Sequence, residues 1–213
     1  MNKLKVYLTA SILMFFAVTG VTIVASIFDQ TKDQIAENER LALLSSINEL
    51  VTSDQYDNDI FTDIISVSPS DLLGNSESKP VYRARKAGWP VAAILTVIAP
   101  DGYNGKIKLL VAIKLDGTLK GARVVSHQET PGLGDGIDVS RSNWILDFAE
   151  KSLTNPDEKR WKVKRDGGDF DQFSGATITP RAIVKAIKNA LLYFRIHHQK
   201  LFETNAPEVE STS

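Results

Sequence analysis

An uncharged run of 23 residues near the N-terminus constrains this chain more than any other feature. It extends over residues 6–28 and contains no Asp, Glu, Lys or Arg. At a rise of about 1.5 Å per residue, a helix of this length covers the roughly 30 Å hydrocarbon core of a bilayer. We therefore predict a transmembrane helix over residues 6–28, with a short cytoplasmic segment, residues 1–5, before it.

A cleaved secretory signal is the alternative interpretation of this run. Signal peptides have shorter apolar cores of about 7–15 residues, and only Val24-Ala25-Ser26 resembles a cleavage site. The positive-inside rule places the N-terminus in the cytoplasm, because lysines precede the run and aspartates follow it, namely Lys3, Lys5, Asp29 and Asp33. We expect an uncleaved single-pass anchor whose remaining residues face outward.

The remainder of the chain has the composition of one soluble domain. About 185 residues follow the run, which is enough for a single hydrophobic core. Lys and Arg number 25 against 26 Asp and Glu, and a net charge of -1 provides no basic surface for nucleic acid. The chain has no cysteine, which excludes thiolate-bound zinc and cysteine-ligated iron–sulfur clusters within it. Any redox chemistry must come from another cofactor.

Apolar periodicity predicts an α+β fold in which an antiparallel sheet has flanking helices. Residues 31–50 have helical spacing, and residues 53–80 are expected to be an irregular connection with one short strand. Four β-rich runs follow, separated by turn residues that favour hairpins, at 81–86, 91–99, 106–115 and 118–127. Apolar residues alternate with lysines around residue 109, which predicts one buried and one solvated face.

Two further helices and an edge strand complete the prediction. A helix is expected over residues 140–153, capped by Ser140 or Ser142, with an inward stripe of Trp144, Ile145 and Phe148. The last helix is predicted to have Thr179 as its N-cap and Pro180 as its first residue. Trp161–Arg165 alternates as an edge strand does, with its cations either on a solvated face or near a bound anion. Residues 203–213 are expected to be a disordered tail.

Small and hydroxyl-bearing residues are concentrated just ahead of this last helix, between residues 167 and 184. A helix N-terminus has unpaired amides and about half a positive charge, so a phosphate placed there would be stabilised, with Arg181 adding charge. The alternative is that Ser, Gly and Thr serve only to form the turn and cap the helix. Local chemistry alone leaves both interpretations open.

The stretch Asp171–Thr177, which reads DQFSGAT, resembles the Dxx(S/T)GAT flavinylation motif of the FMN-binding domain family. That family includes the G subunit of Rnf/Rsx electron-transport complexes and the C subunit of a sodium-pumping NADH:quinone oxidoreductase. Residues 100–105, 127–135 and 166–180, together with the N-terminal anchor, are similar to the Rnf/Rsx member in particular. The resemblance covers nearly the whole chain and is weakest over residues 53–80 and 203–213.

The resemblance implies that a flavin transferase attaches FMN through a phosphoester to the last threonine of the motif, Thr177. It divides the chain into the anchor, a membrane-proximal helix and connection over residues 29–80, and an FMN-binding domain over residues 81–202. It implies that the cofactor site comprises Asp171, Ser174, Gly175, Ala176, Thr177 and Thr179 around the attachment point, with Glu129, Thr130, Gly132, Leu133 and Gly134 in a loop.

The loop of residues 129–134 also has a physical interpretation of its own. Two glycines on either side of Leu133 would let the backbone lie against a flat aromatic ring, although an ordinary turn would use the same residues. Glu129 is expected to act as a structural hydrogen-bond acceptor. Tyr103 is a candidate to stack on the ring, whereas Trp144 is assigned to the core.

The implied function is that of a membrane-anchored electron-transfer subunit in an ion-translocating complex of the bacterial inner membrane, with its soluble domain in the periplasm. The cofactor would perform the redox step, so no catalytic residues and no metal ligands are predicted, and the three histidines are expected to be solvated or structural. Two alternatives remain, namely a stand-alone membrane-tethered flavoprotein that acts as donor or sensor, and a cofactor-free membrane adaptor.

Overall fold

The structure is a computed structural model that describes residues 3–203, with side chains from Tyr7 onward. Most of the predicted disordered tail, residues 204–213, therefore lies outside the described residues. The chain divides between Leu44 and Ser45 into two units, each of which is described separately below. The long helix α1 (Lys3–Leu50) contributes to both units.

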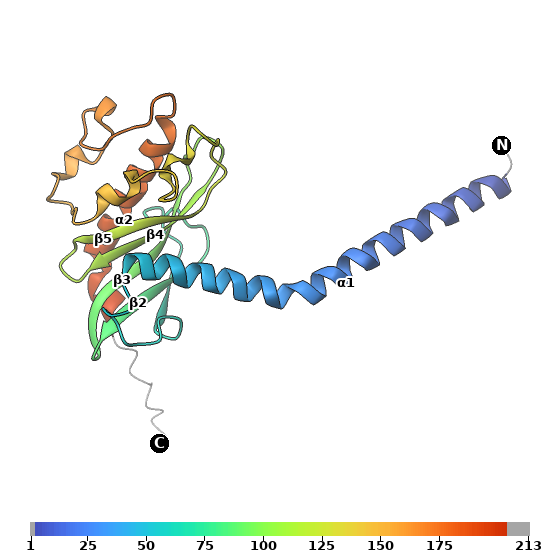
Figure 1. Cartoon of the computed structure of the whole chain (residues 1–213), viewed down its shortest axis with the longest axis horizontal. Helices are drawn as coiled ribbons and strands as arrows, with labels where there is room; N and C mark the ends of the chain where they lie inside the picture. The colour runs from blue at the N-terminus through green and yellow to red at the C-terminus, as the bar shows by residue number, and fades with distance from the viewer. Residues whose placement is uncertain (1–2, 204–213) are drawn as a thin grey trace, which may run out of the picture. The chain divides into compact units, whose positions relative to one another are not determined.

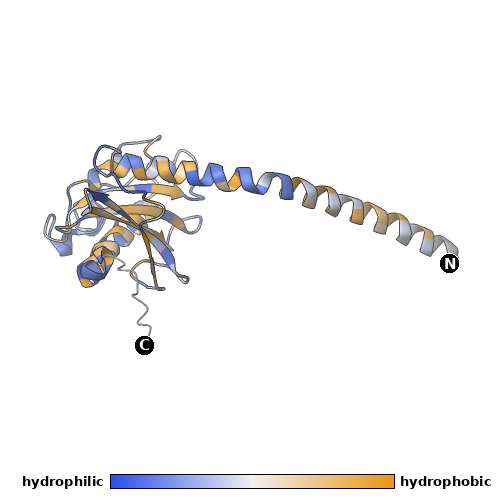
Figure 2. Cartoon of the chain, turned by 90° about the horizontal axis from the view of Figure 1, so that it is seen from below, coloured by the Kyte–Doolittle hydropathy of each residue, from blue (hydrophilic) through white to orange (hydrophobic). Residues whose placement is uncertain are grey.

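The first unit consists of the part of α1 that precedes Ser45. α1 is the one helix of residues 3–203 that is long and apolar enough to cross a membrane, and its apolar window has no buried residue. The large apolar side chains from Tyr7 to Phe28 are exposed, and Figure 2 shows this stretch as orange and pale, followed by a bluer, charged part of the helix. A helix that exposes apolar residues on all sides has the pattern of a membrane span.

The second unit is built on a five-stranded antiparallel sheet, shown in Figure 1. Its strands follow chain order as β1 (Ile64–Val67), β2 (Lys79–Lys86), β3 (Trp89–Ala99), β4 (Ile107–Lys114) and β5 (Leu119–Ser126). The four predicted runs and the short strand before them are therefore confirmed, each within a few residues of its expected bounds. The tightest connection joins β2 to β3, where Lys86 pairs with Trp89, whereas residues 68–78 separate β1 from β2.

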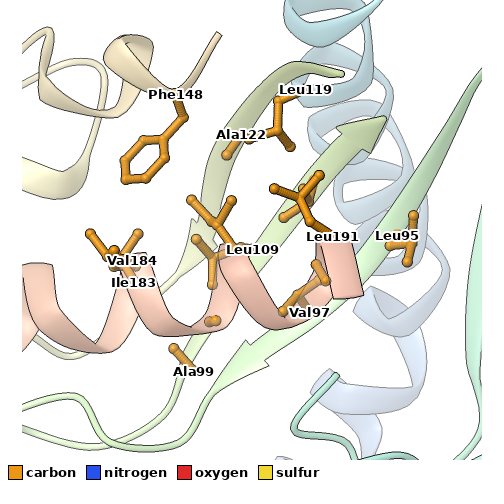
Figure 3. Packing of buried hydrophobic residues seen from close by; sticks show 14 of the residues in the cluster. Leu95, Val97, Ala99, Leu109, Leu119, Ala122, Phe148, Ile183, Val184 and Leu191 are labelled. Carbon is orange, nitrogen blue, oxygen red and sulfur yellow. The ribbon is translucent and has the colours of Figure 1, made fainter. Parts of the chain in front are cut away.

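Helix α2 (Ile178–Phe202) packs on one face of this sheet, mainly against β3 and β4. Figure 3 shows Ile183, Val184 and Leu191 of this helix in one cluster with Val97 and Leu109 of the strands. These side chains and Phe148 belong to one buried cluster. Burying such side chains is worth about 1.5–3 kcal/mol each, so the helix is fixed to the sheet by its own stripe.

The other face of the sheet is less solvated than predicted. Lys108 is exposed, as expected, but Leu110 and Ala112 on the same face are completely buried. The last turn of α1, which belongs to this unit, accounts for part of this burial, because Leu50 lies against Gly121 of β5. Short apolar side chains on this face make room for that helical turn.

The predicted helix over residues 140–153 is wrong in type and extent. A 3-10 helix, η2 (Trp144–Phe148), is present instead, and although the Asn143 side chain does not cap it, the hydroxyl of Ser142, one of the two predicted caps, accepts the Trp144 N–H at 3.2 Å. The chain cannot continue as a helix because the backbone of Glu150 and Lys151 pairs with Leu119 at the start of β5. The inward stripe is confirmed, since Trp144, Ile145 and Phe148 are all buried.

The predicted edge strand at Trp161–Arg165 is also wrong, although its alternation has a physical basis. Trp161 and Val163 are buried while Lys162 is exposed. The backbone forms one isolated β-bridge, between Val163 and Phe170. One 3-10 turn precedes Val163 and another follows it. The alternation of buried and exposed residues therefore reflects the packing of aromatic rings. The ring centroids of Trp161 and Phe170 are 4.8 Å apart.

Candidate functional site

A tight turn presents the predicted attachment motif immediately before α2. Phe173 pairs with Ala176 across it, and Gly175 has a φ of +81°, a conformation that glycine adopts without strain. Phe173 anchors the turn by packing edge-on against Trp144, with ring centroids 5.3 Å apart. Ser174 and Gly175 are exposed at its tip.

The start of α2 differs from the prediction. The helix begins at Ile178, and the N-cap position is occupied by Thr177, whose side chain makes no capping hydrogen bond. Thr179, the predicted cap, lies within the first turn, because its hydroxyl is directed at Glu129 instead of its own helix. Pro180 remains in the first turn, where a missing N–H has no helical partner to lose.

The hydroxyl of Thr177 is therefore available for chemistry. Thr177 is half-buried, and within residues 3–203 its side chain has no hydrogen-bond partner. The amides of Ile178 and Thr179 likewise have no acceptor among the described residues, as expected for the first turn of a helix. One nucleophilic oxygen thus lies beside two free N–H donors.

Glu129 joins three separate segments of the chain at this site. Its carboxylate accepts a hydrogen bond from the Thr179 hydroxyl and another, at 3.1 Å, from the backbone N–H of Asn104. Its own N–H donates to Nδ1 of His127 at 2.9 Å. Glu129 is 4% exposed and Thr179 is 1% exposed, so this network is buried. Glu129 is an acceptor in this structure, as predicted.

Two glycines lie close to the Glu129 carboxylate. A Cβ atom at Gly134 would lie 2.8 Å from Oε2 of Glu129, and one at Gly102 would lie 2.8 Å from Oε1. Contacts this short do not occur between real Cβ atoms and their neighbours, so Gly134 makes room for the carboxylate, whereas a Cβ at Gly102 would clash first with the carbonyl oxygen of Gly105, at 2.3 Å. Gly134 therefore serves the packing of Glu129. Gly132, at φ +76°, has open space where a Cβ would be.

A cavity of about 150 Å³ lies between this loop and the start of α2. It is lined by most of the predicted cofactor residues, namely Glu129, Thr130, Leu133, Gly134, Gly175, Ala176, Thr177 and Thr179, together with Tyr103 and Ile178. Three of the lining side chains are large, apolar or aromatic, and substantially exposed, at 66% for Tyr103, 50% for Leu133 and 45% for Ile178. The cavity thus combines an apolar rim with polar groups at its base.

Gly132, Ser174 and Asp171 do not line this cavity. Gly132 and Ser174 line an open groove on the other side of Leu133, and the Asp171 side chain is exposed and pairs with Lys164 at 2.6 Å. Asp171 still contributes through its backbone, because its carbonyl accepts a hydrogen bond from the indole of Trp144 at 2.9 Å. This bond fixes the start of the motif.

Arg181 is bound to a carboxylate of the protein itself. It donates two hydrogen bonds to Asp166, at 2.6 and 2.9 Å. These bonds hold the pKa of Asp166 below its usual range and raise the pKa of Arg181. Both groups are solvent-exposed, so the pair contributes little to stability, and Arg181 is not free to neutralise a phosphate unless it leaves Asp166.

His127 is structural. Its Nδ1 accepts the Glu129 amide, so Nε2 has the proton and donates to Asp138 at 2.9 Å. Both ring nitrogens are thereby engaged. Over residues 3–203 no group of three or more His, Cys, Asp or Glu side chains is arranged to hold a metal ion.

Sequence reasoning did not assign Ile178 or Asn104 to the site. Ile178 follows the motif directly and is an exposed large apolar residue at the first position of α2, a pattern that could have indicated it. Asn104 contributes through its backbone N–H, and its side-chain amide donates to the Thr130 hydroxyl at 2.9 Å. No local signal identifies such a contact, because its partners are about 25 residues away.

Comparisons with known proteins identify the relatives of this chain. Residues 102–192 match the FMN-binding domain, and residues 1–50 match the RnfG N-terminal region. The G subunit of an ion-translocating oxidoreductase complex from Vibrio atlanticus is 49% identical over 190 residues, covering 89% of this chain and 90% of that protein. Proteins described in the same words from Shewanella baltica and Shewanella loihica are 46% and 42% identical, covering 90% and 96% of both chains.

Proposed function

The chain belongs to the family of G subunits of ion-translocating oxidoreductase complexes, and from this premise we propose that it transfers electrons through FMN bound covalently to Thr177. The chain is a membrane protein with an FMN-binding domain.

The free hydroxyl of Thr177 at the start of α2 supports attachment at this residue. A phosphate esterified to this oxygen would lie at the helix N-terminus, where the unpaired amides of Ile178 and Thr179 can donate to it. In the attachment step, Oγ1 of Thr177 bonds to the phosphorus of the FMN half of FAD. The bond to AMP breaks, and the hydroxyl proton leaves to solvent. A flavin transferase is the proposed catalyst.

The cavity beside Thr177 fits part of a flavin. Its volume of about 150 Å³ is below the roughly 300–1,000 Å³ of sites that enclose a ligand of this size. A flavin held there would therefore keep one side open to a partner. Leu133, Tyr103 and Ile178 provide the apolar rim, and Thr130 and Glu129 provide the polar base.

When bound, FMN supplies the exchange of one or two electrons, and the protein supplies tethering, orientation and electrostatics. We propose that the partners are the other subunits of the complex, since this cysteine-free chain has no ligands for iron–sulfur clusters of its own. We place the anchor in the bacterial inner membrane and the FMN-binding unit in the periplasm, on the charge asymmetry around residues 6–28.

Substitution of the attachment residue tests this function. The full chain is produced with an active flavin transferase and denatured in detergent, and flavin fluorescence is recorded on the separated polypeptide. We expect Thr177→Val to lose the fluorescent band and Ser174→Ala, at the exposed tip of the same turn, to keep it. A band of undiminished intensity in Thr177→Val would refute the attachment site.

A further inference from the structure

The cavity beside Thr177 contains one acidic side chain and, among its described lining residues, no basic one. The acidic side chain is Glu129, which is 4% exposed. A buried carboxylate facing a ligand cavity without a cation is unusual, because burial of a charge is costly unless strong hydrogen bonds compensate for it. The position of Glu129 therefore requires an explanation beyond packing.

The hydrogen-bond donors to this carboxylate are neutral. Oε1 accepts from the Asn104 amide and Oε2 from the Thr179 hydroxyl, and no ion pair of the described residues includes Glu129. The nearby His127 does not supply a charge, because its Nδ1 accepts the Glu129 amide and so bears no proton. Its other nitrogen is bonded to Asp138. The negative charge is held in place but is not neutralised.

The backbone is shaped around this carboxylate. Gly134 admits Oε2 of Glu129, which would lie 2.8 Å from a Cβ at this position. The turn before β4 supplies the Asn104 amide and the first turn of α2 supplies the Thr179 hydroxyl, so two further segments converge on this one carboxylate. Because Thr179 binds Glu129 and lies two residues after Thr177, the position of the carboxylate is fixed relative to Thr177.

We propose that the charge of Glu129 lowers the reduction potential of the flavin held on Thr177. Reduction adds negative charge to the ring system, and a fixed carboxylate beside it in a partly buried site disfavours that addition. Because the effect acts through charge, it depends on the carboxylate and not on its shape. This inference rests on the proposed covalent attachment of FMN.

The test is a spectroelectrochemical titration of the full flavinylated chain in detergent, after mass spectrometry has verified one FMN per polypeptide. Glu129→Gln keeps the shape of the side chain and removes its charge. We expect its midpoint potential to become more positive, corresponding to about a tenfold change in the equilibrium constant, or about 59 mV for one electron.

Two further variants separate charge from structure. Thr179→Val removes the hydroxyl donor to Glu129 but leaves the carboxyl group, so at alkaline pH, where that group stays ionised, its potential should stay unchanged or become more negative. Glu150→Gln removes an exposed carboxylate that pairs with Lys114, outside the cavity, and should leave the potential unchanged. If Glu129 were only structural, Glu129→Gln and Thr179→Val would shift the potential in the same direction.

An unchanged potential in a folded, flavinylated Glu129→Gln variant would overturn the inference. A positive shift in Thr179→Val at alkaline pH would overturn it equally, so the inference can still be refuted if Glu129→Gln does not fold. Melting of the flavin-free chains provides the readout of folding. Absence of FMN from the wild-type polypeptide would instead refute the proposed function, and this inference with it.

Discussion

At the scale of single residues, the site depends on hydroxyl groups whose roles differ although they are two positions apart. Thr177 has a free hydroxyl at the N-cap, while the hydroxyl of Thr179 is buried against Glu129. The sequence motif identified Thr177 as the attachment candidate, because the motif specifies a chemical group. It could not reveal the partner of Thr179, which lies 50 residues away in the chain.

Thr179→Ala tests the buried hydrogen bond. The variant leaves Glu129 with one donor fewer in a buried site, which costs about 1–3 kcal/mol of unfolding free energy. Thr179→Ser, which keeps the hydroxyl, is the matched control and should lose less. The measurement is chemical denaturation of the flavin-free chain, and equal stability of wild type and Thr179→Ala would contradict the role assigned to this bond.

At the scale of elements, the strands were predictable and the segment between β5 and α2 was not. The strands β2 to β5 are β-rich runs joined by short connections, so their pairing is encoded locally. Residues 140–176 are organised by distant contacts, such as the pairing of Glu150 with Leu119 and the stacking of Phe148 on Phe170. These contacts convert a helical pattern into a 3-10 turn and an apparent strand into irregular chain.

The two glycines in the loop of residues 129–134 serve different purposes. Gly132 adopts a positive φ, and Gly134 makes room for Glu129. Gly132→Ala places a residue with φ +76° in open space and should cost about 1–2 kcal/mol in backbone strain alone. Gly134→Ala has no such strain, but its Cβ would lie 3.0 Å from the Thr179 hydroxyl oxygen and 2.8 Å from Glu129 Oε2. It should cost about 1–3 kcal/mol by overpacking.

Double variants with Thr179→Ala distinguish the two causes. Removal of the Thr179 hydroxyl relieves part of the crowding at Gly134, so Gly134→Ala and Thr179→Ala should be non-additive by about 0.5 kcal/mol or more. Gly132→Ala and Thr179→Ala should be additive. The stabilities come from denaturant titrations, and non-additivity of the Gly132 pair instead would show that the loop glycines have been assigned incorrectly.

At the scale of the whole molecule, the apolar stretch of α1 and the FMN-binding unit imply a defined topology. Lysines before residue 6 and aspartates after residue 28 favour a cytoplasmic N-terminus. A reporter that is active only outside the cytoplasm, fused after Ser213, should be active, and a cytoplasm-only reporter at the same point should be silent. The opposite pattern would place the flavin on the wrong side of the membrane for this account.

The most direct test of the central claim is a peptide map of the chain produced with its transferase. Trypsin releases residues 166–181, which contain the candidate hydroxyls Ser174, Thr177 and Thr179. We expect this peptide to have gained the mass of FMN less one water, and fragmentation to place that mass on Thr177. Placement of the added mass on Ser174 or Thr179, or an unmodified peptide from fully flavinylated protein, would contradict the account.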